Sequence, residues 1–312
     1  MRGGYSALVA RSHEARRMRA VHMITLQLVL NALALGMAYA LVALGFVLAL
    51  NASGAVNFAH GDLVVLGGAV AVLLAAWLGL PGFLLLPLVA LALAGAGVLA
   101  AHVAILPLAR RPPEATFVAT IALAAMIEQT LTVTMGAAPR TTPPFLGSGA
   151  VTIAGVPLGL QPLAIVIVGA VLVAALWFLL ERTQIGRRMR AVAADRHMAR
   201  AVGIPVRRYV TLSLALSGAL AGIAGFLLGH QFLVTPTQGG GHMLKAYIAV
   251  ALGGWGSVPG ALIGALAIGL FETFVSAEVG DAWASAALYI AVLLVLTLRP
   301  RGLFGEPVGQ RA

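Results

Sequence analysis

Long apolar runs constrain this chain more than any other feature of its sequence. A segment of about 20 mainly apolar residues is long enough to cross a lipid bilayer as a helix. Such segments recur along nearly the whole chain, and the stretches between them are too short to fold as a separate domain. The sequence predicts an all-α, polytopic transmembrane bundle of about eight segments, at residues 23–50, 61–80, 83–107, 115–136, 160–181, 209–233, 243–275 and 282–298.

The positive charge is clustered between these segments. Nineteen Arg and one Lys stand against ten acidic residues, with five Arg in residues 1–22 and eight in residues 181–208. A nucleic-acid interface needs a solvated basic face with stacking aromatics, whereas these Arg flank apolar spans, so we expect no nucleic-acid partner and a role in membrane topology. The absence of cysteine excludes disulfides and Cys-ligated metal sites.

The distribution of Arg also predicts an orientation. If all eight segments crossed the membrane, the Arg would be divided almost evenly between its two sides, against the positive-inside bias. If segments 61–80 and 243–275 are instead broken or re-entrant, eighteen Arg fall on the cytoplasmic side and only Arg140 outside. We therefore expect a basic arm at 1–22, a transmembrane domain at 23–298 with a cytoplasmic loop at 182–208, and a tail at 299–312, with both termini cytoplasmic.

The same two segments carry helix-breaking chemistry. A polar stretch, Asn51 to Asp62, stands between two apolar runs, and residues 253–260 contain four Gly and one Pro. Glycine costs roughly 1 kcal/mol and proline roughly 3 kcal/mol in a helix interior. Backbone groups released by such breaks cannot face lipid and must be buried or line a wet cavity. Discontinuous segments in the two halves of a chain are typical of a transport pathway.

Three motifs carry a family resemblance that extends from about residue 25 to residue 300. The stretch from Asn57 to Asp62 resembles the signature of branched-chain amino acid ABC permeases of the shorter subunit type. Residues 186–203 resemble the cytoplasmic coupling loop of that family, and residues 252–264 resemble its C-terminal glycine motif. Broader ABC permeases have a Glu-Ala-Ala pattern in this loop, and Ala194 stands in the place of its Glu, which leaves the ATPase contacts open.

The resemblance implies a transport subunit of the bacterial inner membrane rather than an enzyme. Its cargo would be hydrophobic amino acids delivered by an external binding protein, and its partners a second, LivM-like permease subunit or a second copy of the chain, two cytoplasmic ATPases and the lipid bilayer. No cofactor is implied. The only lysine, Lys245, lies between Leu244 and Ala246, so the chain cannot supply a Walker A site. Met23 resembles the usual family start, and the sequence leaves Met1, Met18 and Met23 open as the true start.

Two sets of residues are the candidate sites. The predicted substrate pathway consists of Gly54, Asn57, Phe58, His60, Gly61, Asp62, Gly253, Gly254, Trp255, Gly256, Ser257, Pro259, Gly260 and Glu272. The predicted ATPase-coupling set consists of Gly186, Arg187, Arg190, Ala193, Ala194, Asp195, Met198, Ala199 and Gly203. His60 and Asp62 lack a third ligand, so we predict no metal site there.

Ionisable side chains within the apolar segments leave alternatives open. Glu272 fits a pathway role and a packing role equally, Glu128 fits packing, and Lys245 fits snorkelling to the membrane interface. A stand-alone secondary transporter or channel would use Glu272, Asp62 and Glu128 to relay protons or ions. An ABC permease for urea, amides or sugars is a further alternative.

Overall fold

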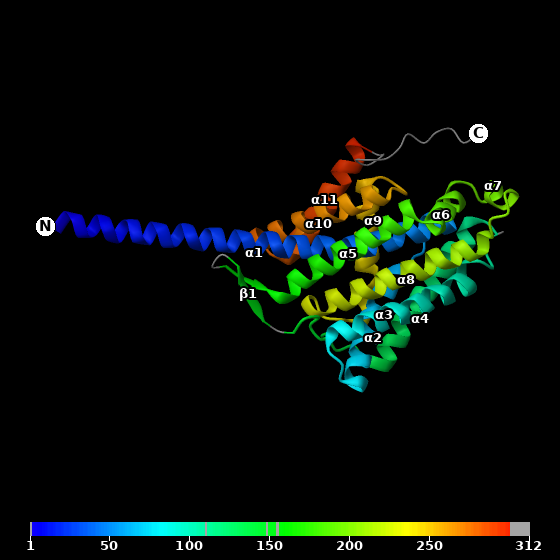
Figure 1. Cartoon of the computed structure of the whole chain (residues 1–312), viewed down its shortest axis with the longest axis horizontal. Helices are drawn as coiled ribbons and strands as arrows, with labels where there is room; N and C mark the ends of the chain where they lie inside the picture. The colour runs from blue at the N-terminus through cyan, green and yellow to red at the C-terminus, as the bar shows by residue number, and fades with distance from the viewer. Residues whose placement is uncertain (1, 110, 148, 154–155, 300–312) are drawn as a thin grey trace.

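The structure is a computed structural model that describes residues 2–109, 111–147, 149–153 and 156–299. Apart from one β-hairpin, the described elements are helices, and the predicted all-α bundle is confirmed (Figure 1). In chain order the elements are α1 (Arg2–Ser53), α2 (His60–Leu78), α3 (Gly82–Ala100), the π-helix η1 (Ala101–Ile105), α4 (Pro113–Met135), β1 (Ala150–Ile153), β2 (Val156–Gly159), α5 (Leu160–Arg182), α6 (Gln184–Ala194), α7 (Arg196–Ala201), α8 (Val206–Gln231), the 3₁₀-helix η2 (Pro236–Gln238), α9 (Gly239–Gly253), α10 (Val258–Val279) and α11 (Asp281–Leu298).

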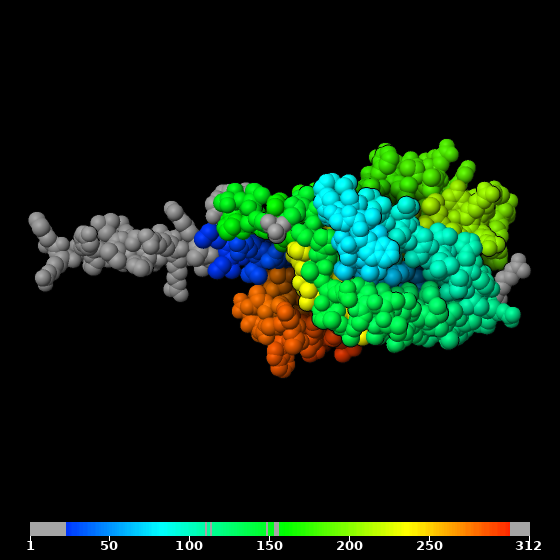
Figure 2. Space-filling view, turned by 90° about the horizontal axis from the view of Figure 1, so that it is seen from below, coloured from blue at the N-terminus to red at the C-terminus, as the bar shows by residue number. Residues whose placement is uncertain are grey.

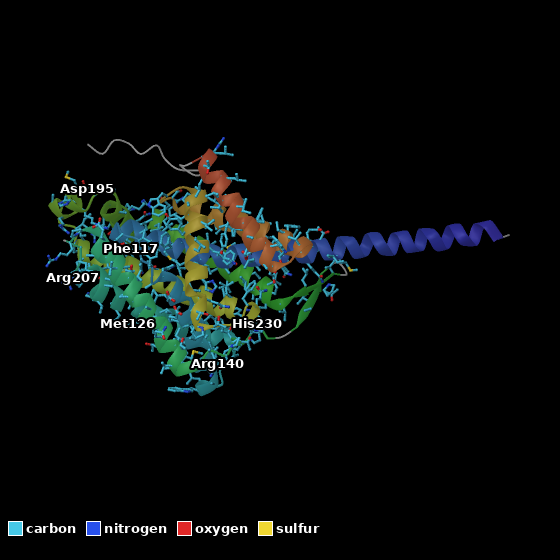
Figure 3. All side chains as sticks on the ribbon, turned by 180° about the vertical axis from the view of Figure 1, so that it is seen from behind. Phe117, Met126, Arg140, Asp195, Arg207 and His230 are labelled. Atoms are coloured by element: carbon cyan, nitrogen blue, oxygen red, sulfur yellow. The ribbon has the colours of Figure 1, made fainter. Side chains whose placement is uncertain are left out.

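The apolar segments form membrane-spanning helices. Among the described residues, eight helices are long and apolar enough to cross a bilayer, namely α1 from Met23, α2, α3 continued by η1, α4, α5, α8, α10 and α11. The predicted segment 243–275 is divided into α9 and α10. Because α9 has only 15 residues, it is shorter than a full span, and it lies across the bundle in contact with α1, α2 and α10 (Figure 3).

Helix α1 forms the centre of the bundle. Its apolar window is 89% buried, and it packs against α5, α8, α9 and α10. Small residues allow this close packing: a Cβ atom added to Gly269 of α10 would collide with the backbone of Gly36 in α1. Because lipid provides no hydrophobic force between helices, the van der Waals contact that small residues allow is one of the main forces that hold them together.

Glycine also joins α8 to its neighbours. A side chain at Gly218 would collide with the carbonyl of Leu93 in α3, and one at Gly67 of α2 would collide with the backbone of Gly222. The small residues four apart in α8 therefore serve packing within the subunit.

The hairpin was not predicted. Ala150 pairs with Gly159 and Ile153 with Val156 in an antiparallel register. The side-chain amide of Gln27 donates a hydrogen bond of 2.8 Å to the carbonyl of Pro157, so the hairpin contacts α1 near the start of its membrane span.

The expectation that the N-terminal arm and the 182–208 loop share one side is wrong. Helix α1 is continuous, and its last turn contacts the loop, where Arg196 donates a hydrogen bond of 2.6 Å to the carbonyl of Ala52. The helix begins at the opposite end of the bundle (Figure 1). The sequence count of Arg had treated 61–80 as an incomplete crossing, whereas α2 is unbroken and the interruption precedes it. Residues 300–312 of the predicted tail lie outside the described residues.

Candidate transport pathway and coupling loop

The first backbone break lies between α1 and α2. Gly54 has a φ of 65°, a conformation that residues with side chains rarely adopt. The chain then turns back into the bundle, since His60 at the start of α2 lies beside Val42, well before the end of α1. His60 is fully buried, and its ring bonds to the Val42 carbonyl at 2.9 Å and the Ser217 hydroxyl at 3.2 Å. Helix α2 therefore starts inside the protein.

The predicted residues around this break are packed rather than open. Asn57 is buried and accepts a hydrogen bond of 3.2 Å from the Ala59 amide, while its own Nδ2 has no partner among the described residues. A buried donor without an acceptor calls for a water or for another conformation. The Phe58 ring stands edge-on to Phe117, with 4.8 Å between centroids.

Gly61 and Asp62 lie against the start of α9. A side chain at Gly61 would meet the carbonyl of Gly239, and a side chain at Gly239 would meet the Asp62 carboxylate. Asp62 is buried in the first turn of α2. The N-terminus of α9 therefore lies at a carboxylate, where the helix dipole favours negative charge.

The second break, predicted from Gly and Pro, is confirmed at residues 254–257 between α9 and α10. Gly254 and Gly256 have φ values of 108° and 79°, and the Ser257 hydroxyl caps α10 by accepting a hydrogen bond of 3.1 Å from the Gly260 amide. The backbones of Gly253 and Gly260 are in direct contact, so that a Cβ atom on either one would collide with the other. The glycines let the two helices meet at this corner, and Pro259 occupies the first turn of α10, where its missing N–H costs nothing.

Asn51 and Phe46 connect the two breaks. The side-chain amide of Asn51, in the last turn of α1, donates a hydrogen bond of 2.9 Å to the carbonyl of Gly256. The buried Phe46 ring lies 6.2 Å from the His60 ring and 6.4 Å from the Trp255 ring. Trp255 is half-exposed and also stands edge-on to Tyr247. Sequence reasoning missed both connecting residues, because the link between Asn51 and Gly256 spans 205 positions.

Two large cavities lie on either side of the last turn of α1. The larger, of about 1590 Å³, is lined by Gly54 together with residues of the α3–α4 connection, α7 and α8. The smaller, of about 750 Å³, lies between α1, α5 and α10 and has Asn51, Gly256 and Pro259 in its wall. Its other lining residues are mainly aliphatic, including Leu44, Leu48 and Leu262. Of the predicted pathway residues, Gly54, Gly256 and Pro259 thus line a cavity, and the pathway as a whole stays a prediction.

The 182–208 loop folds into two short helices at one end of the bundle. Thr183 caps α6 by accepting a hydrogen bond of 3.0 Å from the Gly186 amide. The Asp195 carboxylate caps α7 by accepting hydrogen bonds of 2.7 and 3.0 Å from the amides of His197 and Met198. Figure 3 labels Asp195 and Arg207 at this end and Arg140 and His230 away from it. Figure 2 shows α6 and α7 at the same end as the connection between α3 and α4.

The loop residues divide into an anchored set and an exposed set. Gly186 and Ala199 are buried, and Arg190 forms an ion pair of 3.0 Å with Glu181. Ala193, Ala194 and Arg187 are exposed, as are Gly203 and Asp195. Met198 is 64% exposed. Of the small contact face that the sequence predicted, Ala193, Ala194 and Met198 are thus available to a partner, whereas Ala199 and Gly186 hold the loop against the bundle.

The sequence suggests that Lys245 snorkels to the membrane interface, but in the structure it does not. Its ammonium forms an ion pair of 2.6 Å with Glu272 and donates a hydrogen bond of 2.6 Å to the Tyr39 hydroxyl, which donates one of 3.0 Å to the same carboxylate. The Lys245 and Glu272 side chains are 19% and 14% exposed. Within the described part of the chain, no ion pair or hydrogen bond joins Glu272 to Asp62 or Glu128. Glu272 therefore links α1, α9 and α10 through Tyr39 and Lys245, and its role in the pathway stays a prediction.

A comparison with known protein families assigns the chain just described to one of them. The profile of the family described as "Branched-chain amino acid transport system / permease component" matches residues 28–297. The chain belongs to this permease family. The match runs from within the membrane span of α1 to the last turn of α11, so both breaks and the loop belong to the family region.

Individual relatives agree with this assignment. The permease is 29% identical over 295 residues to the high-affinity branched-chain amino acid transport system permease protein BraD of Pseudomonas aeruginosa, covering 90% of this chain and 96% of the relative. It is 30% identical over 298 residues to the corresponding protein LivH of Escherichia coli K12, with the same coverage. A shorter match, 37% over 114 residues, covers 34% of this chain and 32% of the fructose import permease protein FrcC of Rhizobium meliloti. No solved structure matches the permease.

Proposed function

We propose that the chain is the permease subunit of an ATP-driven importer in the bacterial inner membrane, which moves branched-chain or other hydrophobic amino acids delivered by an external binding protein. Family membership supports this proposal, as do two full-length relatives whose names give branched-chain amino acid transport. The transmembrane architecture agrees with a permease, since eight helices in the described part of the chain are suited to span a membrane.

The loop end of the bundle faces the cytoplasm in this proposal. Ten Arg belong to the sequence between α3 and α4 and to residues 181–208, and both regions lie at that end, as Arg111 and Arg196 line the same cavity. Cytoplasmic loops of membrane proteins are enriched in Arg and Lys. The start of α1 and Arg140 then lie on the external side.

The substrate passes along the smaller cavity beside the second break. Its aliphatic wall suits the side chain of a branched amino acid. Open backbone at the break offers N–H groups for a carboxylate and carbonyl groups for an ammonium, the two charged groups of a zwitterion. The carbonyl of Gly256, held by Asn51, lies in this wall.

One continuous series of contacts carries the proposal of ATP-driven transport. The ATPase contacts the exposed Ala193, Ala194 and Met198. Arg196, next in the same loop, holds the carbonyl of Ala52, and the neighbouring Asn51 holds Gly256 in the second break. A displacement of the loop is thereby transmitted to the backbone beside the substrate cavity. The complete transporter contains two ATPases and a second permease, either LivM-like or a second copy of this chain.

Reconstitution in proteoliposomes with the partner subunits tests this coupling. We expect Arg196→Gln to reduce leucine uptake at least fivefold while ATP hydrolysis continues, because the loop then moves without α1. Arg182→Gln is the matched control, since Arg182 lies at the end of α5 over the Trp177 ring. Equal uptake by the Arg196 variant and the native chain, at equal protein levels, would refute the series of contacts.

A secondary carrier is the rival function. It would need neither ATPase nor binding protein, and uptake would persist in vesicles that contain this chain alone and no ATP. Uptake of fructose rather than leucine by the assembled transporter would instead favour a sugar permease. The partial match to FrcC is the observation that favours this alternative.

A further inference from the structure

The larger cavity has a strongly cationic lining, of which the coupling proposal uses only Arg196. Five arginines line it: Arg111, Arg196, Arg200, Arg207 and Arg208. His102 and His197 also face it, and no Asp or Glu is among its described lining residues. Asp195 is adjacent in sequence, but its carboxylate caps α7. A pocket of about 1590 Å³ with this charge attracts an anion.

Acidic side chains among the described residues do little to neutralise the positive charge of these arginines. Two ion pairs are found among the described residues, Arg190 with Glu181 and Lys245 with Glu272. Neither of them includes one of the five arginines. Arg196 donates to the neutral carbonyl of Ala52. Burial, and then the positive charge of Arg200, lower the pKa of the Arg196 guanidinium. An anion in the cavity would relieve both effects.

One part of the cavity wall is apolar. Val98 and Ile105 from α3 and η1 line it, together with Val210, Leu212 and Ala215 from α8. All of these belong to helices suited to span the membrane. The cavity thus combines cationic groups at the arginine-rich end of the bundle with an apolar wall that continues toward the membrane interior.

We propose that this cavity binds an anionic phospholipid, with its phosphate among Arg200, Arg207 and Arg208 and an acyl chain against the wall formed by α3, η1 and α8. Basic pockets between transmembrane helices on the cytoplasmic side suit anionic headgroups. Arginine offers a planar set of donors that matches phosphate. The amphipathic lining favours a lipid over a small anion, because a small anion would leave the apolar wall exposed to water. Lipid binding at this place would hold α7 and α8 together beside the coupling contact of Arg196.

Lipid binding to the purified full chain tests the proposal. After delipidation in detergent, we expect phosphatidylglycerol to raise the Tm and to give a bound adduct in native mass spectrometry, whereas phosphatidylcholine does neither. The triple variant Arg200→Gln, Arg207→Gln, Arg208→Gln should bind phosphatidylglycerol at least tenfold more weakly while its circular dichroism is unchanged. Arg187→Gln is the matched control, because Arg187 is an exposed arginine of the same loop that does not line the cavity.

Several outcomes would overturn the proposal. Equal weakening by Arg187→Gln would indicate a diffuse charge effect. Inorganic phosphate that reproduces the full rise in Tm would indicate a small-anion site. If the triple variant keeps its lipid and instead loses the ATPase during purification, the arginines serve a protein interface. Because the readout is lipid binding, a failure here leaves the transport proposal standing, and a failure of transport leaves this one standing.

Discussion

Asn51 Nδ2 lies 2.9 Å from the carbonyl oxygen of Gly256 and so ties the last turn of α1 to the bend between α9 and α10. Asn51→Ala removes this bond, which is worth about 1 kcal/mol. We expect the initial rate of amino acid uptake to fall severalfold, measured at equal protein levels. Gln27→Ala is the matched control, because Gln27 makes the same type of bond from α1 to the Pro157 carbonyl near the start of the membrane span. Equal effects of the two variants would contradict a special role of Asn51.

The contact between Gly253 and Gly260 predicts sensitivity to a single methyl group. Gly260→Ala forces α9 and α10 apart, and we expect a loss of stability of about 1–3 kcal/mol, the usual cost of overpacking. Thermal unfolding in detergent measures it. Gly240→Ala and Gly241→Ala are the controls, because a Cβ atom at either place meets nothing within 4 Å. These helical positions should be neutral or slightly stabilised, and a larger loss at Gly240 than at Gly260 would refute the packing argument.

The contributions of Lys245 and Glu272 to the stability of the protein are expected to depend on each other. Removing one partner leaves the other charge buried, so Lys245→Met and Glu272→Gln should each destabilise the protein by about 3 kcal/mol. The double variant should be more stable than the sum of the two losses predicts, because no unpaired charge remains. Unfolding midpoints of the three variants complete the cycle. Strict additivity would mean that the pair is not coupled.

The cap of α7 is expected to control the order of the coupling loop. Asp195→Ala removes the acceptor for two backbone amides, at a cost of about 1 kcal/mol. We expect faster hydrogen exchange at the His197 and Met198 amides and weaker coupling of ATP hydrolysis to uptake. Asp195→Asn should retain most of the native behaviour, since Asn is an equally good cap. If Asn and Ala behave alike, the carboxylate acts in some other way.

Much of the fold follows from local sequence. The apolar segments predicted the helices because a helix that satisfies its own backbone is the only single-segment solution in lipid. Gly254, Gly256 and Pro259 predicted the second break because glycine and proline are unfavourable in a helix interior. The hairpin at residues 150–159 was missed because its two strands are only four residues long, and one of them contains Pro157, which is unusual within a strand.

The candidate site could be predicted only in part, because its key contacts join distant helices. Lys245 and Glu272 are 27 positions apart on two different helices, and only the corner at Gly253 and Gly260 brings them together. The direction of α1 was missed because the Arg count depended on how many segments cross, and it treated 61–80 as an incomplete crossing, although α2 is an unbroken helix.

The last turn of α1 is the common wall of both cavities, with Ser53 on the larger side and Asn51 on the smaller. A sideways shift of this turn widens one space and narrows the other by the same movement. A lipid held in the larger space and an amino acid travelling past the smaller one would therefore sense each other without touching. The lipid composition of the membrane would in this way change the rate of amino acid uptake.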